Sequence, residues 1–62
     1  MMLNLNPNAP APDEIYEAII TMHDGLDDEA SARVNARLIM ILANHIGDAA
    51  IVREAARIAR DA

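Results

Sequence analysis

The fold of this chain is decided by its middle stretch, residues 27–47, which reads DDEASARVNARLIMILANHIG. Apolar residues recur through it at helical spacing, while the acidic start and the final glycine mark the two ends of a helix. We expect Asp27 to be the N-cap, and the helix to run to Ile46 and stop at Gly47. Such a helix has about 19 residues and is roughly 28 Å long.

The apolar arc of this middle helix is unusually wide. At 100° per residue, apolar side chains cover more than half of the circumference, and the clear polar stripe holds only Arg33, Arg37 and Asn44, with Met40 beside them. One neighbouring helix covers a stripe about 100° wide. The middle helix is therefore expected to need cover from two sides.

Two further helices are predicted, one on either side of the middle one in sequence. The first begins around Pro12 or Asp13 and ends before Gly25, with apolar side chains on one arc and acidic ones on the other. The last has Asp48 as its N-cap and continues to the C-terminus, and its alanine-rich face buries little area per residue. We expect the first helix to form a hairpin with the middle one and the last helix to pack on it as well.

Residues 1–12 read as an extended, proline-rich leader, because three prolines and three asparagines favour turn or polyproline geometry. Leu3 and Leu5 alternate with polar residues, so this arm either lies along a partner or is simply disordered. The predicted fold class is all-α, with a flexible leader over residues 1–12 and a single three-helix domain over residues 13–62.

A chain of 62 residues makes one small domain, whose core rarely provides more than about 3–5 kcal/mol. Disulfides are excluded because there is no cysteine, and no metal site is expected from His23 and His45, which lie far apart in sequence. Oligomerisation or docking on a partner is the remaining source of stability. We therefore expect a homodimer or a subunit of a complex with another protein.

The net charge of −5 opposes nucleic-acid binding, which needs basic side chains to neutralise phosphates. No apolar stretch is long enough to span a membrane, and residues 1–13 do not resemble a signal peptide, so we expect a cytoplasmic protein. Charge is unevenly placed: residues 13–29 hold seven acidic side chains and no basic one, and all five arginines follow. These halves either pair, within one chain or between two copies, or are solvated helix faces.

Side chains suited to catalysis are scarce, since the chain has no lysine and its one serine, Ser31, has no base nearby. We predict no catalytic residues and no cofactor. His23 and His45 fall in apolar arcs and are expected to be packed or interface histidines. Asn35, between Leu42 and Ile46 on the apolar arc, is expected to bond either across an interface or to a neighbouring helix backbone.

The predicted docking surface lies on the middle helix. Its candidate residues are Asn35, Leu38, Ile39, Leu42, Asn44, His45 and Ile46, with Arg33, Arg37 and His23 as secondary candidates. The arginines of this helix either meet a carboxylate on a partner or are solvated. In the last helix, Glu54 is placed to pair with Arg57 at a spacing of three residues.

Three stretches carry a resemblance: residues 12–19 (PDEIYEAI), residues 23–26 (HDGL) and above all residues 35–48 (NARLIMILANHIGD). On these the chain resembles a family of very short bacterial proteins catalogued as a domain of unknown function. The resemblance covers nearly everything after the leader, and it points to Asn35, Arg37, Asn44, His45, Gly47 and Asp48 as the signature. It implies genes that lie beside those of flavin-dependent aromatic hydroxylases and related catabolic enzymes.

The expected function is that of a small non-catalytic accessory protein that docks on a larger partner, for example a flavin-dependent monooxygenase. The alternative is a homo-oligomeric helical module that binds a small acidic or aromatic ligand between subunits. In that case the histidines and arginines would serve as polar contacts in an apolar pocket.

Overall fold

The computed structural model describes residues 2–62 of the chain. Within them lie three α-helices and no strand: α1 (Pro12–Thr21), α2 (Asp28–Ile46) and α3 (Ala49–Asp61). The predicted all-α, three-helix class is confirmed.

The ends of α2 and the start of α3 lie where the sequence predicts them. The Asp27 side chain accepts a hydrogen bond from the Ala30 amide at 2.8 Å, which satisfies one of the unpaired N–H groups at the start of α2. Gly47 ends α2 in the left-handed conformation, with a φ of 67° that a residue with a Cβ adopts only under strain. Asp48 then caps α3 by accepting from two amide groups. These caps join α2 and α3 by a two-residue connection.

The first helix, α1, is shorter than the other two. It begins with Pro12 in its first turn, and no side chain caps it. The helix ends at Thr21, and residues 22–25 continue as a turn in which Gly25 has a φ of 75°. The end thus falls before Gly25, as predicted.

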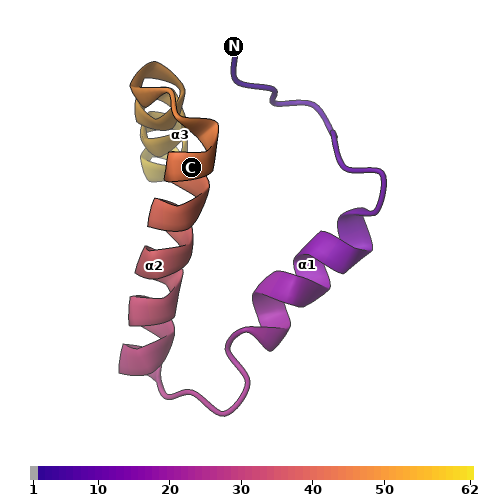
Figure 1. Cartoon of the computed structure of the whole chain (residues 1–62), viewed down its shortest axis with the longest axis vertical. Helices are drawn as coiled ribbons and strands as arrows, with labels where there is room; N and C mark the ends of the chain where they lie inside the picture. The colour runs from indigo at the N-terminus through magenta and orange to yellow at the C-terminus, as the bar shows by residue number, and fades with distance from the viewer. Residues whose placement is uncertain (1) are drawn as a thin grey trace.

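Among the helices of residues 2–62, only α2 and α3 pack against each other. Figure 1 shows α1 diverging from α2, so that the two helices form an open V joined by the connection at its base. The expectation that the first helix packs on the middle one is therefore wrong. Hydrophobic periodicity shows which face of a helix is apolar, but α2 offers apolar side chains in several directions and so defines no single docking face for α1.

The leader runs from the start of α1 back toward the start of α3 (Figure 1). Met2, Leu3 and Leu5 line a hollow of about 290 Å³ together with Ala50 and Ile51 of α3. The two leucines thus lie beside a helix of their own chain. Ile51, at 7% exposure, is the one buried side chain among residues 2–62. The small core therefore sits where the leader meets the start of α3.

The Asp48 cap provides a direct test of how α3 begins. Asp48→Ala removes the acceptor for the Ala50 and Ile51 amides, so we expect a loss of about 1 kcal/mol of stability. In a chain of this size that corresponds to a melting temperature roughly 4–8 °C lower. Circular dichroism melts at one fixed chain concentration measure it.

Asp24→Ala is the matched control, because it removes the same charge from an exposed position in the turn after α1. The control should melt close to the parent. Equal losses in the two variants would show that the effect is one of net charge rather than capping.

Candidate interaction surface

Four successive residues of α2 leave large apolar side chains in solvent. Ile39 is 61% exposed, Met40 68%, Ile41 65% and Leu42 50%. Successive residues of an α-helix point 100° apart, so these four side chains face in four different directions. The exposed apolar side chains of α2 are therefore distributed around the helix, on either side of its polar stripe, rather than gathered in one stripe.

The predicted surface residues of α2 divide into two groups on opposite sides of the helix. Helical spacing places Asn35, Ile39, Leu42 and Ile46 along one stripe, with Leu38 and His45 on its flank. Leu38 and Ile46 are half-buried, whereas Asn35 and His45 are exposed. Asn44 lies on the far side with the two arginines, so one flat partner surface would not contact all the candidates.

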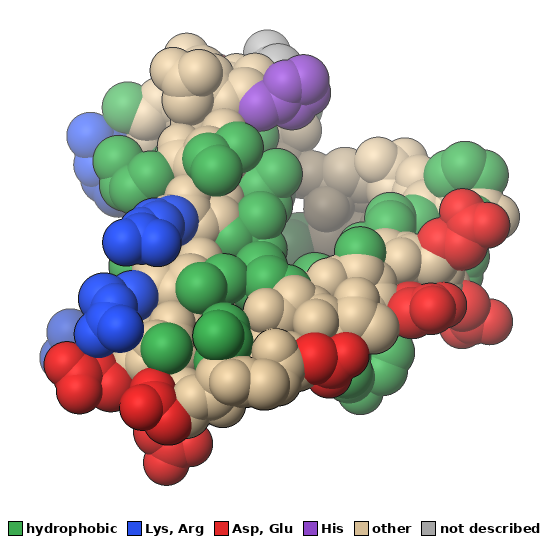
Figure 2. Space-filling view, turned by 60° about the horizontal axis from the view of Figure 1, so that its bottom comes forward, with side chains coloured by type: hydrophobic (Ala, Val, Ile, Leu, Met, Phe, Trp, Pro, Cys, Tyr) green, Lys and Arg blue, Asp and Glu red, His purple; other side chains and the backbone are tan. Residues whose placement is uncertain are grey.

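The apolar side chains of α1 are exposed as well, although the sequence predicts them to be packed within the chain. Ile15, Tyr16, Ile19 and Ile20 are all exposed. Their helical spacing predicts that this face of α1 packs against another apolar surface. The spacing does not say whether that surface belongs to the same chain or to another one. Figure 2 shows hydrophobic side chains open to view between the arginines on one flank and the acidic side chains on the α1 flank.

His23 links the connection after α1 to α2. Its Nδ1 lies 2.8 Å from the Ile19 carbonyl oxygen, and its Nε2 lies 2.8 Å from Asn35 Oδ1. A carbonyl oxygen only accepts, so Nδ1 carries a proton. In the imidazolium form Nε2 donates to Asn35 Oδ1; in the neutral ring the amide turns so that its NH₂ group donates to Nε2. Asn35 thus bonds a side chain of its own chain, an arrangement that neither sequence-based alternative named.

The polar stripe of α2 carries exposed charge. Arg33 pairs with Glu29 one turn earlier, with Nη1 to Oε1 at 3.2 Å. Both side chains are solvent-exposed, so this ion pair contributes little to stability. Arg37 is exposed, and Asn44 lines an open hollow of about 460 Å³ with Met40, Gly47 and Val52. His45 lies in the last turn of α2, where a positive charge would interact favourably with the helix dipole.

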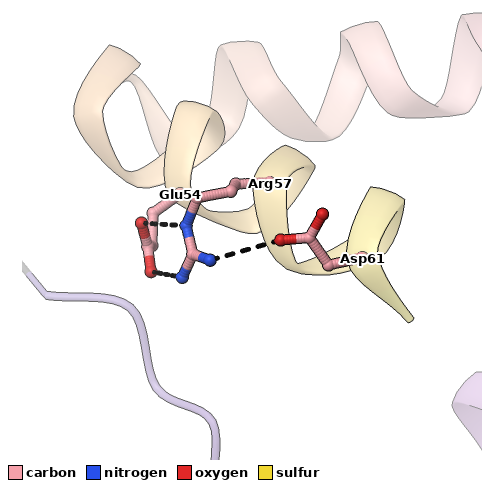
Figure 3. A network of polar contacts seen from close by, with 3 residues as sticks. All are labelled: Glu54, Arg57 and Asp61. Atoms are coloured by element: carbon pink, nitrogen blue, oxygen red, sulfur yellow. Dashed lines mark hydrogen bonds and ion pairs between the residues drawn. The ribbon is translucent and has the colours of Figure 1, made fainter.

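On α3 the predicted pair of Glu54 and Arg57 is confirmed and extends to Asp61 (Figure 3). Arg57 donates from Nη2 and Nε to the two carboxylate oxygens of Glu54 at 2.6 and 3.2 Å, and from Nη1 to Asp61 at 3.4 Å. Through the hydrogen bonds and its charge, Arg57 holds the pKa of the Glu54 carboxyl below its ordinary value. Glu54 in turn raises the pKa of Arg57.

Within residues 2–62 no three potential ligand side chains gather to hold a metal ion. Over the same residues, no helix combines the length and the apolar character needed to cross a membrane. The features that stand out are thus an apolar surface and its charged borders.

Comparison with known proteins assigns the chain to a protein family whose function is unknown. The model of a protein family described as "Protein of unknown function (DUF2783)" matches residues 3–61. The chain therefore belongs to this family, which agrees with the resemblance to a domain of unknown function. No curated protein and no solved structure gave a match.

The α3 network predicts a pH dependence whose sign follows from the Glu54 pKa. Since that pKa is lowered in the folded chain, the ionised carboxylate stabilises the fold above the pKa of the unfolded chain. The contribution is lost as the pH falls through the folded pKa. We expect Glu54→Gln to melt below the parent at pH 7 and the two to converge on acidification.

Thermal melts followed by circular dichroism between pH 7 and pH 2 measure this difference. The effect is small because the pair is exposed, and added salt should reduce it. A gap between Glu54→Gln and the parent that persists unchanged at pH 2 would contradict an electrostatic origin.

Proposed function

We propose that this protein is a non-catalytic interaction protein that completes its hydrophobic core with another polypeptide. The observation that carries the proposal is burial: Ile51 is the one buried side chain in the described part of the chain, while α1 and α2 leave large apolar side chains exposed. A soluble monomer rarely exposes a large contiguous apolar surface, and such surfaces mark interaction sites.

The exposed area agrees with this proposal in magnitude. The chain exposes 5511 Å² of surface. A compact folded monomer of 6.7 kDa is expected to expose roughly 3,900 Å². The excess of about 1,600 Å² per chain is of the size that one side of a large protein interface buries.

The partner class we propose is an enzyme that this chain serves as an accessory subunit. The resemblance to short bacterial proteins encoded beside flavin-dependent aromatic hydroxylases supports a flavin-dependent monooxygenase as a candidate. We also propose a cytoplasmic location. The chain itself would supply contact surface and no reacting group.

The alternative function, binding of a small acidic or aromatic ligand, has less support from the geometry. The hollow that contains Asn44 is lined by no arginine or histidine, so it offers none of the polar contacts that this alternative expects around a ligand. The leading proposal is therefore a protein partner.

Ile41→Asp tests the proposal, because Ile41 is 65% exposed and a charge there costs little unless another polypeptide covers it. We expect a tagged parent chain, expressed at its native level, to retain a stoichiometric partner through purification. The Ile41→Asp chain should lose that partner. Gel analysis, mass determination and flavin absorbance of the eluate identify what is retained.

Asn8→Asp is the matched control, since it adds the same charge at an exposed position of the leader and should retain the partner. The proposal fails if the tagged parent elutes alone as a monomer that unfolds cooperatively. It also fails if Ile41→Asp and the parent retain the same partner equally well.

A further inference from the structure

The α1 helix is the element that most needs a partner. It has ten residues, exposes its apolar arc, and packs against neither of the other helices. Isolated helices shorter than about 12–15 residues are marginal in water, so α1 needs tertiary contacts to be populated. Whatever covers α1 must present an apolar helix face or groove.

Closing the V within one chain would not shield α2. Ile39 and Ile41 point about 160° apart on the helix, and one covering helix shields a stripe of only about 100°. The bond between His23 and Asn35 also braces the base of the V. Even with α1 laid on its own α2, a sector of α2 would remain exposed and need cover from another chain.

The distribution of charged side chains indicates what kind of polypeptide could cover α1 and α2. Residues 13–29 hold seven acidic side chains and no basic one, whereas residues 30–62 hold five arginines and three acidic side chains. Asp13 and Glu14 border the apolar arc of α1, and Arg33 and Arg37 border the apolar sectors of α2. The acidic border of α1 therefore matches the basic border of α2.

The excess exposed surface of each chain has the size expected for an interface between two copies of the chain. If two copies each bury the excess of about 1,600 Å², the interface totals about 3,200 Å², within the 2,000–5,000 Å² of obligate homodimers. Such interfaces resemble a domain core divided between two chains.

We infer that the polypeptide that completes the core is a second copy of this chain, with α1 of each copy packed on α2 of the other and the two α2 helices in contact, so that each α2 is covered from two sides. This inference rests on the proposed function and names its immediate partner. The exchange is reciprocal, as a two-fold dimer requires.

A charge exchange between copies tests this arrangement. One variant carries Asp13→Arg and Glu14→Arg, and the other carries Arg33→Glu and Arg37→Glu. Either variant alone would place like charges across both α1–α2 contacts, whereas an equimolar mixture restores opposite charges at both. The mixed pair also has the same total charge as two parent chains.

Sedimentation and light scattering at low ionic strength measure the association. We expect the parent chain to be a dimer. Each variant alone should dimerise with a dissociation constant raised about tenfold or more, and the equimolar mixture should regain the dissociation constant of the parent. Arg53→Glu with Arg60→Glu is the control, because it changes the net charge as the α2 variant does but on the outer face of α3. The control should stay a dimer.

Several results would overturn the inference. A dimeric parent whose variants do not recover on mixing rules out the α1–α2 exchange between copies. A parent that is monomeric and unfolds without cooperativity rules out the second copy but leaves the proposed function intact, with a different polypeptide as partner. A monomeric parent that unfolds cooperatively overturns both.

Discussion

The structure depends on one constraint, which is the shielding of α2 from water. Four successive apolar residues, Ile39 to Leu42, face four directions around a single helix. Burying a large aliphatic side chain is worth about 1.5–3 kcal/mol, and each one left in water forgoes that gain. One neighbouring helix, α3, packs on α2, and the leader extends the small core around Ile51. The remaining apolar side chains of α2 stay exposed to water, and burying them requires a second polypeptide.

Local interactions explain why the helices nevertheless have defined ends. Asp27 and Asp48 satisfy amide groups that would otherwise lack partners, and Gly47 permits the tight turn between α2 and α3. These contacts lie within a few residues of one another in sequence. They fix where α2 begins and ends and where α3 begins, without deciding how the helices are arranged, which only long-range burial can do.

The same distinction separates what could be predicted from the sequence from what could not. Caps, breakers and the wide apolar arc of α2 are properties of short segments, so the three helices followed from them. The open position of α1 did not, because an apolar face on Ile15 and Ile19 is equally consistent with burial in the same chain or in another. The bond of His23 to Asn35 was also missed, since it joins side chains twelve residues apart across a connection whose course the sequence does not determine.

The central claim is that the core of this protein is completed between polypeptides. It is tested most directly by the thermal unfolding of the purified parent chain over a hundredfold range of concentration. Linkage between folding and association predicts that the melting temperature falls and the transition broadens as the chain is diluted. A sharp transition whose midpoint does not move with dilution would contradict the account.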